Sequence, residues 1–415
     1  MLTNIGNSKK DDNNNLIIKP SELKKKMDDG DDFIILDVRT QQEHDMWTIS
    51  YDKYQESTLI PVDTLMSTES LNKLPKDKEI IAFCAHGQRS SYAASALSSM
   101  GYNVRTMEGG IAEWSNIYDV ANVEIDEAIP LKIWQIRRIS KGCMSYVVAS
   151  SKDKTAVVID PTCGIDSVID DLISTYQLKI LNVIDTHMHA DHLSGATKIA
   201  YKYKTQLNIS SAEKYSLEGI SPESHSAIKR INDGDRIKIG DEFYFEAIHT
   251  PGHTEGSMSF ILDLNSGVAE NTTKLDTKNK IANHPLLFFT GDTIFVNGVG
   301  RPDLHNKAQE YTTNLYQTYQ QKIFNLSDNT IVLPTHYSES FEHNIPITNT
   351  LRSIKQKLEN ITHSENSFSD YVLSNIPPQP MNYDKIVKIN RNLISCETVL
   401  YRDLEAGPNS CGIRT

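Results

Sequence analysis

The chain has 415 residues and a formal net charge of -12. This length exceeds one ordinary hydrophobic core, so two or three domains are expected. The acidic balance argues against nucleic acid and anionic membrane as partners, because both are bound mainly through clustered Lys and Arg. Neither the polar start of the chain nor any later apolar run is typical of a signal peptide or a membrane span, which favours a cytoplasmic protein that acts on small molecules.

The first part of the chain predicts a small α/β domain. Residues 1–15 are polar and of low complexity, so we expect a disordered tail there. Apolar strands and helices then alternate, as they do around a parallel sheet. The predicted elements are a helix at 20–27, strands at 33–38 and 79–85, a helix at 89–100 and a strand at 103–107. We place this domain at 16–118 and predict a linker at the polar, acidic stretch 119–129.

Residues 130–415 predict a second, larger domain in which apolar strands follow one another more densely. The expected strands lie at 132–139, 145–150, 155–161, 180–187, 243–250, 257–262, 285–295 and 330–336, with helices at 165–176 and 308–323. This pattern favours a core of two sheets with helices outside. Several of the strands end in His or Asp, which places candidate ligands along one rim of the sheets.

The stretch "THMHADH" carries the densest group of metal-binding residue types, and three further residues of these types each follow an apolar strand. The candidates are His187, His189, Asp191, His192, His253, Asp292 and His336. Imidazole and carboxylate ligands suit both zinc and non-heme iron, and the spacing excludes neither metal.

This set resembles the pattern of the metallo-β-lactamase superfamily, H-x-H-x-D-H followed by a His, a bridging Asp and a last His. The resemblance implies an αβ/βα sandwich over residues 130–415. The segments "GDTIFVNGVGRPDL", "NIPPQPMNYDKIVKINRNL" and "LEAGPNSCGI" further resemble the persulfide dioxygenase branch of that superfamily. In that branch one Fe(II) per chain would be held by His187, His253 and Asp292, the two-His, one-carboxylate triad of non-heme oxygenases.

The same resemblance assigns roles to the remaining residues. His189, Asp191, His192 and His336 would surround the iron and orient its ligands, or would hold a second metal ion. Arg301 and Thr254 would bind substrate, with Arg301 facing the carboxylate of a thiol carrier such as glutathione. The plainer reading of Arg301 is a surface salt bridge.

The stretch "FCAHGQRSS" predicts a reactive thiol. Cys84 follows a buried strand and precedes a helix, so backbone N–H groups and the helix N-terminus would stabilise its thiolate, and Arg89 would add positive charge. With "DVRTQQE" and "MEGGIAEW", the segment resembles a rhodanese domain. The C-x4-R loop is tighter than the C-x5-R cradle of cysteine phosphatases, which favours sulfur transfer by Cys84 and Arg89. Cys84 as an inert, buried residue is the alternative.

The loop "WTISYDKYQES" departs from the family pattern beside the expected site, which puts substrate preference in doubt.

The five cysteines lack CxxC pairs, which predicts no disulfide framework. We expect Cys143 and Cys163 to pack or line the rim rather than react, and Cys411 to belong to a tail motif.

Together these features favour oxidation of a small-molecule persulfide by O2 to sulfite, with the rhodanese part moving sulfur between thiosulfate, sulfite and a thiol. The resemblance also implies a homodimer. One rival is a thioester hydrolase of the glyoxalase II type, in which two Zn(II) ions use all seven metal-binding residues. Another is that one half is a degenerate binding or regulatory module.

Overall fold

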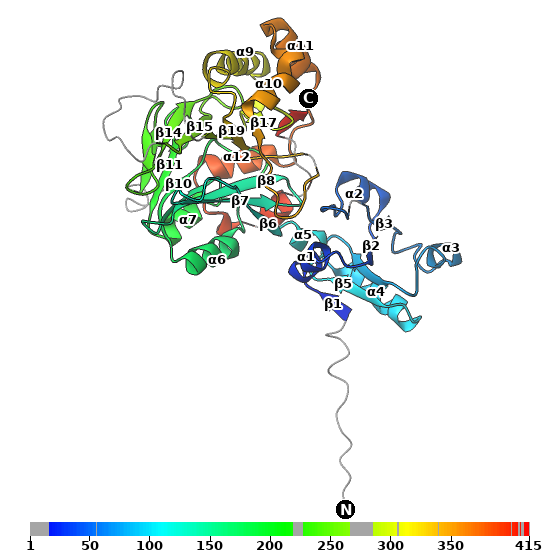
Figure 1. Ribbon diagram of the computed structural model, residues 1–415. Helices are drawn as coiled ribbons and strands as arrows, with labels where there is room; N and C mark the ends of the chain where they lie inside the picture. The colour runs from blue at the N-terminus through cyan, green and yellow to red at the C-terminus, as the bar shows by residue number, and fades with distance from the viewer. Residues whose placement is uncertain are drawn as a thin grey trace, which may run out of the picture.

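The computed structural model describes residues 16–54, 56–218, 227–265, 285–304, 307–338, 340–399, 401–405, 407 and 411–414. Two parts follow each other along the chain, a smaller one drawn in blue and cyan and a larger one that contains the rest (Figure 1). The tail predicted at 1–15 lies outside the described residues.

The smaller part is built on a five-stranded parallel sheet. In sheet order its strands are β1 (Ile17–Ile18), β5 (Val104–Met107), β4 (Glu79–Phe83), β2 (Phe33–Asp37) and β3 (Thr58–Leu59). Its helices are α1 (Pro20–Asp28), α2 (Gln41–Met46), α3 (Thr68–Leu71), α4 (Gln88–Ser99) and α5 (Gly110–Trp114). β2 and β4 are almost wholly apolar because two hydrophobic clusters cover the two faces of the sheet.

The stretch expected to be a linker begins with a strand instead. β6 (Tyr118–Asn122) pairs antiparallel with β7 (Leu131–Arg138), and its side chains alternate between buried and less buried positions. The stretch looked polar because of Asp119, but this carboxylate is fully buried and forms an ion pair with Arg137. A paired charge can lie inside a protein where an isolated one cannot.

The larger part consists of two sheets that pack face to face over a shared hydrophobic cluster. In sheet order the seven-stranded sheet contains β12 (Ile228–Ile231), β11 (Gln206–Ser210), β10 (Lys179–Ile184), β9 (Thr155–Ile159), β8 (Cys143–Ser150), β7 and β6. The six-stranded sheet contains β13 (Arg236–Lys238), β14 (Tyr244–His249), β15 (Met258–Asp263), β16 (Leu286–Gly291), β19 (Ile331–Pro334) and β20 (Asn349–Thr350). A small sheet joins β17 (Ile294–Phe295), β18 (Gly298–Gly300) and β21 (Gly412–Arg414).

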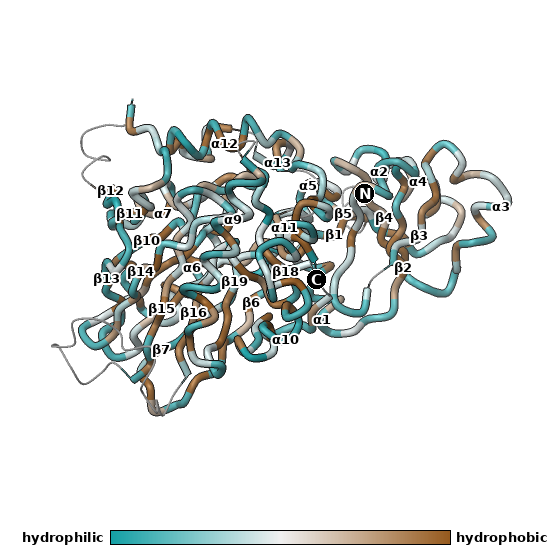
Figure 2. The backbone as a smooth tube through the Cα atoms, turned by 90° about the horizontal axis from the view of Figure 1, so that it is seen from above, coloured by the Kyte–Doolittle hydropathy of each residue, from teal (hydrophilic) through white to brown (hydrophobic). Residues whose placement is uncertain are grey.

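Helices cover the outer faces of both sheets, as Figure 1 shows. On the seven-stranded sheet lie α6 (Asp166–Tyr176) and α7 (Ala196–Lys202). On the six-stranded sheet lie α9 (Ala308–Thr318), the π-helical turn η3 (Tyr319–Ile323), α10 (Leu351–Thr362) and α11 (Glu365–Ser374). The C-terminal region adds α12 (Tyr383–Arg391), η4 (Cys396–Thr398) and α13 (Tyr401–Leu404). Two sheets that face each other, with helices packed on the outer face of each, confirm the predicted αβ/βα sandwich. Hydrophobic stretches, drawn in brown, run along many of the strands in Figure 2.

Within the described ranges, none of the helices combines the length and the hydrophobicity that a transmembrane span requires.

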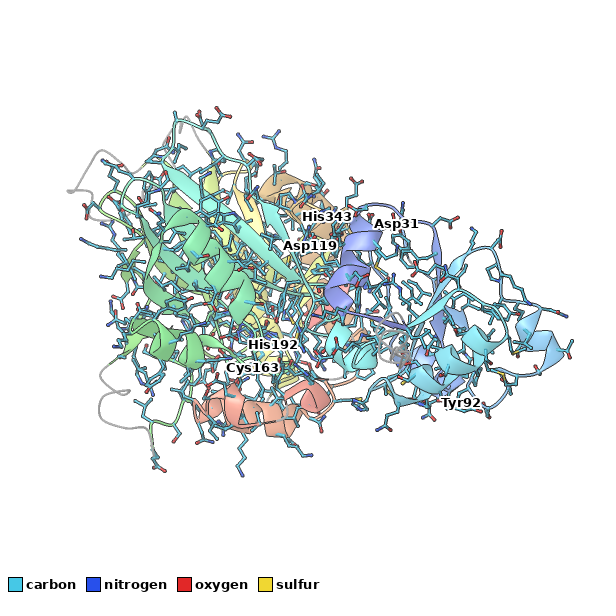
Figure 3. All side chains as sticks on the ribbon, turned by 90° about the horizontal axis from the view of Figure 1, so that it is seen from below. Asp31, Tyr92, Asp119, Cys163, His192 and His343 are labelled. Carbon is cyan, nitrogen blue, oxygen red and sulfur yellow. A yellow bond between two sulfur atoms is a disulfide. The ribbon has the colours of Figure 1, made fainter. Side chains whose placement is uncertain are left out.

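The two parts contact each other through a polar cluster that Figure 3 marks at Asp119 and His343. The Tyr51 hydroxyl donates to Asp28 at 2.6 Å and to Asp119 at 3.1 Å, and the His343 ring lies beside both Tyr51 and Asp119. The indole N–H of Trp47 donates to the carbonyl of Ser140 at 3.0 Å. The unusual loop that begins at Trp47 therefore docks against the larger part.

A disulfide joins Cys163 to Cys396, with a Cα–Cα distance of 6.1 Å. This corrects the expectation that Cys163 only packs or lines the rim. The pair was missed because 233 positions separate the two cysteines, and no local spacing indicates such a bond.

Candidate functional site

Three predicted metal ligands meet at the rim of the two sheets. His187 follows β10, His253 follows β14, and Asp292 follows β16. Asp292 Oδ2 lies 3.6 Å from His187 Nε2 and 3.5 Å from His253 Nε2. Gly291 permits the close approach of the β10 and β16 loops, since a Cβ there would lie 2.7 Å from Thr186 Oγ1.

Hydrogen bonds fix the His187 ring so that one nitrogen faces the other two ligands. Thr186 Oγ1 donates to Asp160 Oδ2 at 2.9 Å, so it must accept from His187 Nδ1–H, which lies 2.8 Å away. The proton therefore lies on Nδ1, and the Nε2 lone pair is directed toward Asp292.

The other two ligands are held in the same way. His253 Nδ1 donates to the backbone carbonyl of Arg301 at 2.8 Å, which leaves its Nε2 as an acceptor. Asp292 Oδ1 accepts from Thr335 Oγ1 at 2.7 Å and from His336 Nδ1 at 2.6 Å, so Oδ2 alone faces the two histidines. Outer hydrogen bonds of this kind orient metal ligands in proteins.

The three facing atoms fit a metal ion. His187 Nε2, His253 Nε2 and Asp292 Oδ2 are buried and have no hydrogen-bond partner among the residues that the structure describes. Two ligand atoms that each lie ~2.1 Å from one ion are separated by ~3.0 to ~3.4 Å, depending on the coordination angle. Buried polar atoms without partners are costly, and a shared cation would satisfy all three at once.

The electrostatics of these groups also suit a cation. Burial lowers the pKa of His187 and His253, so both rings are neutral at physiological pH, as ligands must be. Burial opposes the charged form of Asp292, but the charge and the hydrogen bond of the nearby His336 outweigh it and hold the pKa of this carboxyl well below its usual range. Burial also opposes charge on His336, yet Asp292 and Asp191 raise its pKa well above the ordinary value. The two carboxylates therefore favour positive charge here, as a proton or as a metal ion.

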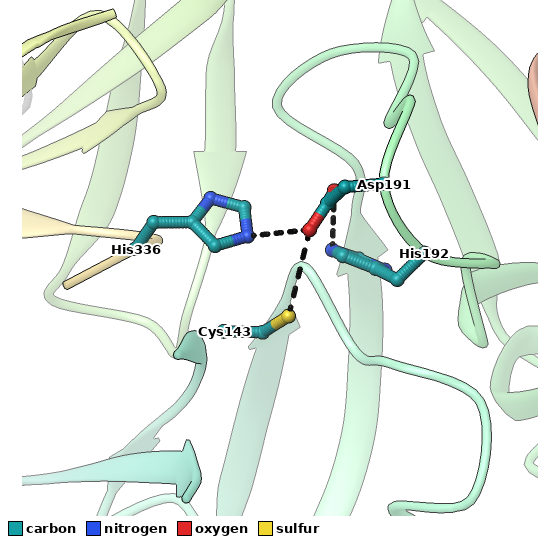
Figure 4. A group of neighbouring side chains, drawn as sticks. All are labelled: Cys143, Asp191, His192 and His336. Atoms are coloured by element: carbon teal, nitrogen blue, oxygen red, sulfur yellow. Dashed lines mark hydrogen bonds and ion pairs between the residues drawn. The ribbon is translucent and has the colours of Figure 1, made fainter. Parts of the chain in front are cut away.

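The other predicted metal residues are also buried nearby, but they divide into two groups. His189 Nε2 lies 3.3 Å from Asp160 Oδ1, and after the opposing effect of burial this carboxylate raises the pKa of His189 to about 9. Asp191, His192 and His336 instead form a group with Cys143, as Figure 4 shows. Sequence reasoning did not place Cys143 among the metal-binding residues, because it lies far from "THMHADH" in the chain.

Two C-terminal residues that sequence reasoning missed hold the metal-binding loop. Asn390 Nδ2 donates to the carbonyls of His189 and His192, each at 2.9 Å, and its Oδ1 accepts from Ser194 N–H at 3.0 Å. Glu405 accepts from Leu193 N–H at 2.6 Å. The only signal for Asn390 in the sequence is its place in the family-like segment "NIPPQPMNYDKIVKINRNL".

The two candidate substrate-binding residues make contacts other than those expected. The Arg301 guanidinium is fully buried and donates to Asp303 at 2.7 and 2.9 Å, as well as to the carbonyls of Pro377 and Pro378. These contacts fit the alternative interpretation of Arg301 as a member of a salt bridge, although its guanidinium and the bond to Asp303 are buried rather than on the surface. Thr254 is also buried, and its hydroxyl donates to Glu213. In this conformation neither side chain is presented to a substrate.

The Cys84 loop surrounds the predicted reactive thiol with hydrogen-bond donors. Cys84 follows β4 and its Sγ accepts from Gly87 N–H at 3.1 Å, just before α4 begins. Burial raises the pKa of the Cys84 thiol, but the N–H and hydroxyl groups of Ser90 and the N–H groups of His86 and Gly87 outweigh it and lower the value. Gly110 is required beside the loop, because a Cβ there would lie 2.3 Å from the Cys84 carbonyl oxygen.

Arg89 lies on the first turn of α4 and pairs with a residue that was not singled out as functional. Its two terminal nitrogens donate to the carboxylate of Glu43 at 2.8 and 2.6 Å. This ion pair is the main cause that lowers the pKa of Glu43 to about 2. Glu43 lies at the end of "DVRTQQE" and also closes a capping box with Thr40.

Models of known protein families match the smaller and the larger part of the chain separately. Residues 19–117 match the model of the rhodanese-like domain, and residues 140–268 match the model of the metallo-β-lactamase superfamily. A hydroxyacylglutathione hydrolase of Dictyostelium discoideum is 30% identical over 222 residues, which cover 53% of this chain and 71% of that protein.

The chain belongs to the metallo-β-lactamase superfamily. It carries a rhodanese-like domain ahead of the metallo-β-lactamase domain. A solved structure described as a metallo-β-lactamase from Staphylococcus aureus subsp. aureus COL has a TM-score of 0.54 and 25% identity, and the match covers 63% of this chain and 72% of that one.

A relative named persulfide dioxygenase ETHE1, mitochondrial, from Bos taurus is 28% identical over 197 residues. The alignment covers 47% of this chain and 65% of the bovine protein, so about a third of that protein has no counterpart in the match.

Proposed function

We propose that the metallo-β-lactamase domain oxidises a low-molecular-weight persulfide with O2 to sulfite at one non-heme iron held by His187, His253 and Asp292. The balanced reaction is RSSH + O2 + H2O → RSH + SO3²⁻ + 2 H⁺, in which the terminal sulfur loses four electrons and O2 gains them. Iron in a two-His, one-carboxylate site supplies reactivity toward O2 and open positions for substrate. The name of the bovine relative supports this reaction. We expect glutathione persulfide or coenzyme A persulfide as the type of substrate.

The division of roles within Asp292 is the observation that carries this proposal. Oδ1 accepts hydrogen bonds from Thr335 and His336, while Oδ2 alone faces His187 and His253. A carboxylate that bridges two metal ions through both of its oxygens would need Oδ1 free of such donors. The arrangement therefore argues against a pair of ions bridged by the two oxygens of Asp292, and it supplies the one donor-free oxygen that a single ion at the triad needs.

The protein's own residues would prepare the site for this reaction. Thr186 and the Arg301 carbonyl hold the two ligand rings with their Nε2 atoms toward the ion. Burial keeps both imidazoles neutral. One carboxylate leaves the iron site with a net positive charge, which favours an anionic persulfide as the incoming group.

The rhodanese-like domain would transfer sulfane sulfur through Cys84. A lowered thiol pKa and donors from Gly87 and Ser90 suit a sulfur atom that alternates between thiolate and persulfide. Transfer between thiosulfate, sulfite and a thiol would either supply RSSH to the iron or remove sulfite as thiosulfate.

A dizinc thioester hydrolase is the second candidate function. The hydroxyacylglutathione hydrolase relative from Dictyostelium discoideum favours it, and all seven metal-binding residues of that reading are present.

Metal analysis and O2 uptake distinguish the two functions. The protein purified without oxygen should contain iron and consume O2 when glutathione persulfide or coenzyme A persulfide is added. Two zinc ions per chain, no O2 consumption and thioester hydrolysis would support the hydrolase instead.

The sulfur transfer function is tested by Cys84→Ser. Removal of a covalent nucleophile should lower thiosulfate:cyanide sulfur transfer by more than ~10³-fold. O2 uptake by the same variant serves as the control for folding and should stay intact. Unchanged sulfur transfer would show that Cys84 is not the nucleophile.

A further inference from the structure

The disulfide between Cys163 and Cys396 lies beside the metal-binding loop, residues 187–195. The N–H group of Cys163 donates to the carbonyl of Leu193 at 3.1 Å. Figure 3 accordingly shows Cys163 next to His192. One end of the disulfide is therefore bound directly to the backbone of this loop.

The other end of the disulfide belongs to the C-terminal segment that consists of α12, η4 and α13. Cys396 is the first residue of η4. Asn390 on α12 donates to two carbonyls of the metal-binding loop, and Glu405, directly after α13, accepts from one of its N–H groups. The disulfide thus ties together two parts of the chain that both hold the same loop.

The apolar packing around the bond is slight. Its small hydrophobic cluster has as buried members Cys163, Leu193, Ile386 and Cys396, so the two cysteines supply half of them. Two ion pairs also hold the end of the segment, Glu405 with Arg138 and Arg402 with Glu113. A segment with so little buried apolar surface is of the kind that opens locally before a protein unfolds as a whole.

We propose that the Cys163–Cys396 disulfide is a redox-sensitive clasp on the metal-binding loop, and that its reduction lowers the affinity of the triad for its metal ion. His187 begins this loop, so the position of that ligand depends on how firmly the loop is held. The clasp requires a metal ion at the triad, but it does not require the persulfide reaction. The reductant is a small thiol, RSH, which the proposed reaction also releases.

Reduction takes place in two exchange steps. A thiolate RS⁻ attacks one sulfur of the disulfide, the S–S bond breaks, one cysteine leaves and takes up a proton, and RS–S forms on the other. A second RS⁻ attacks the carrier sulfur of this mixed disulfide, so RSSR forms and the second cysteine is released. In sum, the protein disulfide and 2 RSH give two cysteine thiols and RSSR, and two electrons pass to the protein.

The metal ion and the disulfide should protect each other. Both cysteines are at most 1% exposed, so a thiol reaches them only when the C-terminal segment opens. If the disulfide raises the metal affinity by some factor, bound metal must make the disulfide harder to reduce by the same factor, because both equilibria belong to one thermodynamic cycle. Loss of contacts around metal ligands weakens metal binding by ~10–100-fold, which sets the expected factor.

Iron affinity and disulfide reduction are measured on the full chain without oxygen. Cys163→Ala together with Cys396→Ala keeps the small cluster apolar, and this variant should bind Fe(II) ~10–100-fold more weakly than the oxidised wild type in competition with a chelator. In glutathione buffers, saturating Fe(II) should shift the midpoint of wild-type disulfide reduction by the same factor in [GSH]²/[GSSG], with alkylated thiols counted by mass spectrometry.

Cys84→Ser is the control for the reactive thiol of the other domain, and it should show the full shift of the midpoint. Equal Fe(II) affinity of the double variant and the oxidised wild type would overturn the proposal. A midpoint that does not respond to Fe(II), or a disulfide that stays intact in the folded protein at every glutathione ratio, would also overturn it.

Hydrogen exchange of the metal-free wild type keeps the test decisive if the double variant fails to fold. Reduction should speed exchange at least ~10-fold in the metal-binding loop, η4 and α13, and leave β7 and β8 unchanged. Unchanged exchange in the loop, or an equal increase in all strands, would show that the bond does not act on the loop and would refute the clasp. None of these readouts uses O2 uptake, so failure of the clasp and failure of the dioxygenase function are distinguishable.

Discussion

The two candidate sites are constructed in opposite ways. The Cys84 site is one short loop between β4 and α4, and consecutive residues supply the thiol and the N–H donors around it. The metal residues instead come from the ends of β10, β14, β16 and β19, which only the packing of two sheets brings together. A local site depends on backbone conformation over a few residues, whereas the metal centre depends on the whole sandwich.

The sites also differ in how they control charge. The Arg89 and Glu43 side chains beside Cys84 are 35% and 34% exposed, so solvent screens their ion pair. His187, His253 and Asp292 are at most 1% exposed, so each charge there must be compensated by a specific partner. Substitutions should therefore have larger effects at the metal centre than around Cys84.

The largest expected effect is the loss of one activity while the other is retained. His253→Ala removes one of three ligands, so iron binding and O2 uptake should be lost while thiosulfate:cyanide transfer remains. His249→Ala is the matched control, because His249 lies at the end of the same strand and its ring forms a hydrogen bond with the Glu255 carbonyl, away from the triad atoms. Metal content and both activities are measured on the purified variants. Loss of sulfur transfer in His253→Ala would mean that the two domains do not act independently.

A smaller effect is expected where the C-terminal region holds the metal-binding loop. Asn390→Ala leaves the buried carbonyls of His189 and His192 without their donor, which should destabilise the fold by ~1–3 kcal/mol. Loss of an outer-shell contact should weaken iron binding by ~10–100-fold.

Asn392→Ala is the matched control for this effect, since its amide donates to the Lys388 carbonyl on the exposed side of the same helix end. Thermal unfolding and iron retention against a chelator measure both variants. Equal melting temperatures and equal iron retention in the two variants would show that Asn390 does not hold the metal-binding loop.

The difference between a site on one short loop and a site assembled from several strand ends determines how much of each could be predicted from the sequence. The Cys84 loop and the seven metal-binding residues carry motifs, and β10, β14, β16 and β19 show as apolar runs that end in His or Asp. The family resemblance separated the triad from the other four residues, but the sequence could not indicate that three of these four form a group with Cys143. Nor could it indicate which ring nitrogen of each ligand faces the metal position, because that depends on the neighbour that holds the other nitrogen. Thr186 and the Arg301 carbonyl decide this for His187 and His253.

Other features were missed because their partners are distant in the chain. Asp119 looks like part of a polar linker until Arg137 pairs with it, and Arg301 looks available to substrate until Asp303 and the Pro377 and Pro378 carbonyls occupy it. The charge of a residue is visible in the sequence, but its partner is not.

Tyr51→Phe tests whether the unusual loop belongs to the domain contact or to the sulfur site. Removal of the hydroxyl takes one hydrogen bond from each of the Asp28 and Asp119 carboxylates, which should cost ~1–3 kcal/mol and lower the melting temperature. The KM for thiosulfate should not change. Tyr54→Phe is the control, because its hydroxyl donates to the Asp31 carbonyl within the smaller domain. A changed KM with an unchanged melting temperature would place the loop at the sulfur site instead.

The smallest effect is expected for Glu43→Gln, which removes the half-exposed ion pair with Arg89. Such a pair contributes less than ~1 kcal/mol in solvent. The folded pKa of Glu43, about 2, lies below the ordinary 4.5, so its contribution is fully present above the ordinary value and is lost as pH falls toward 2. The melting temperatures of wild type and variant should therefore differ slightly at neutral pH and converge as pH falls below about 4. Glu69→Gln, which breaks an exposed pair with Lys73, should match the wild type throughout. A difference that grows as pH falls would show that Glu43 is not stabilised as a carboxylate.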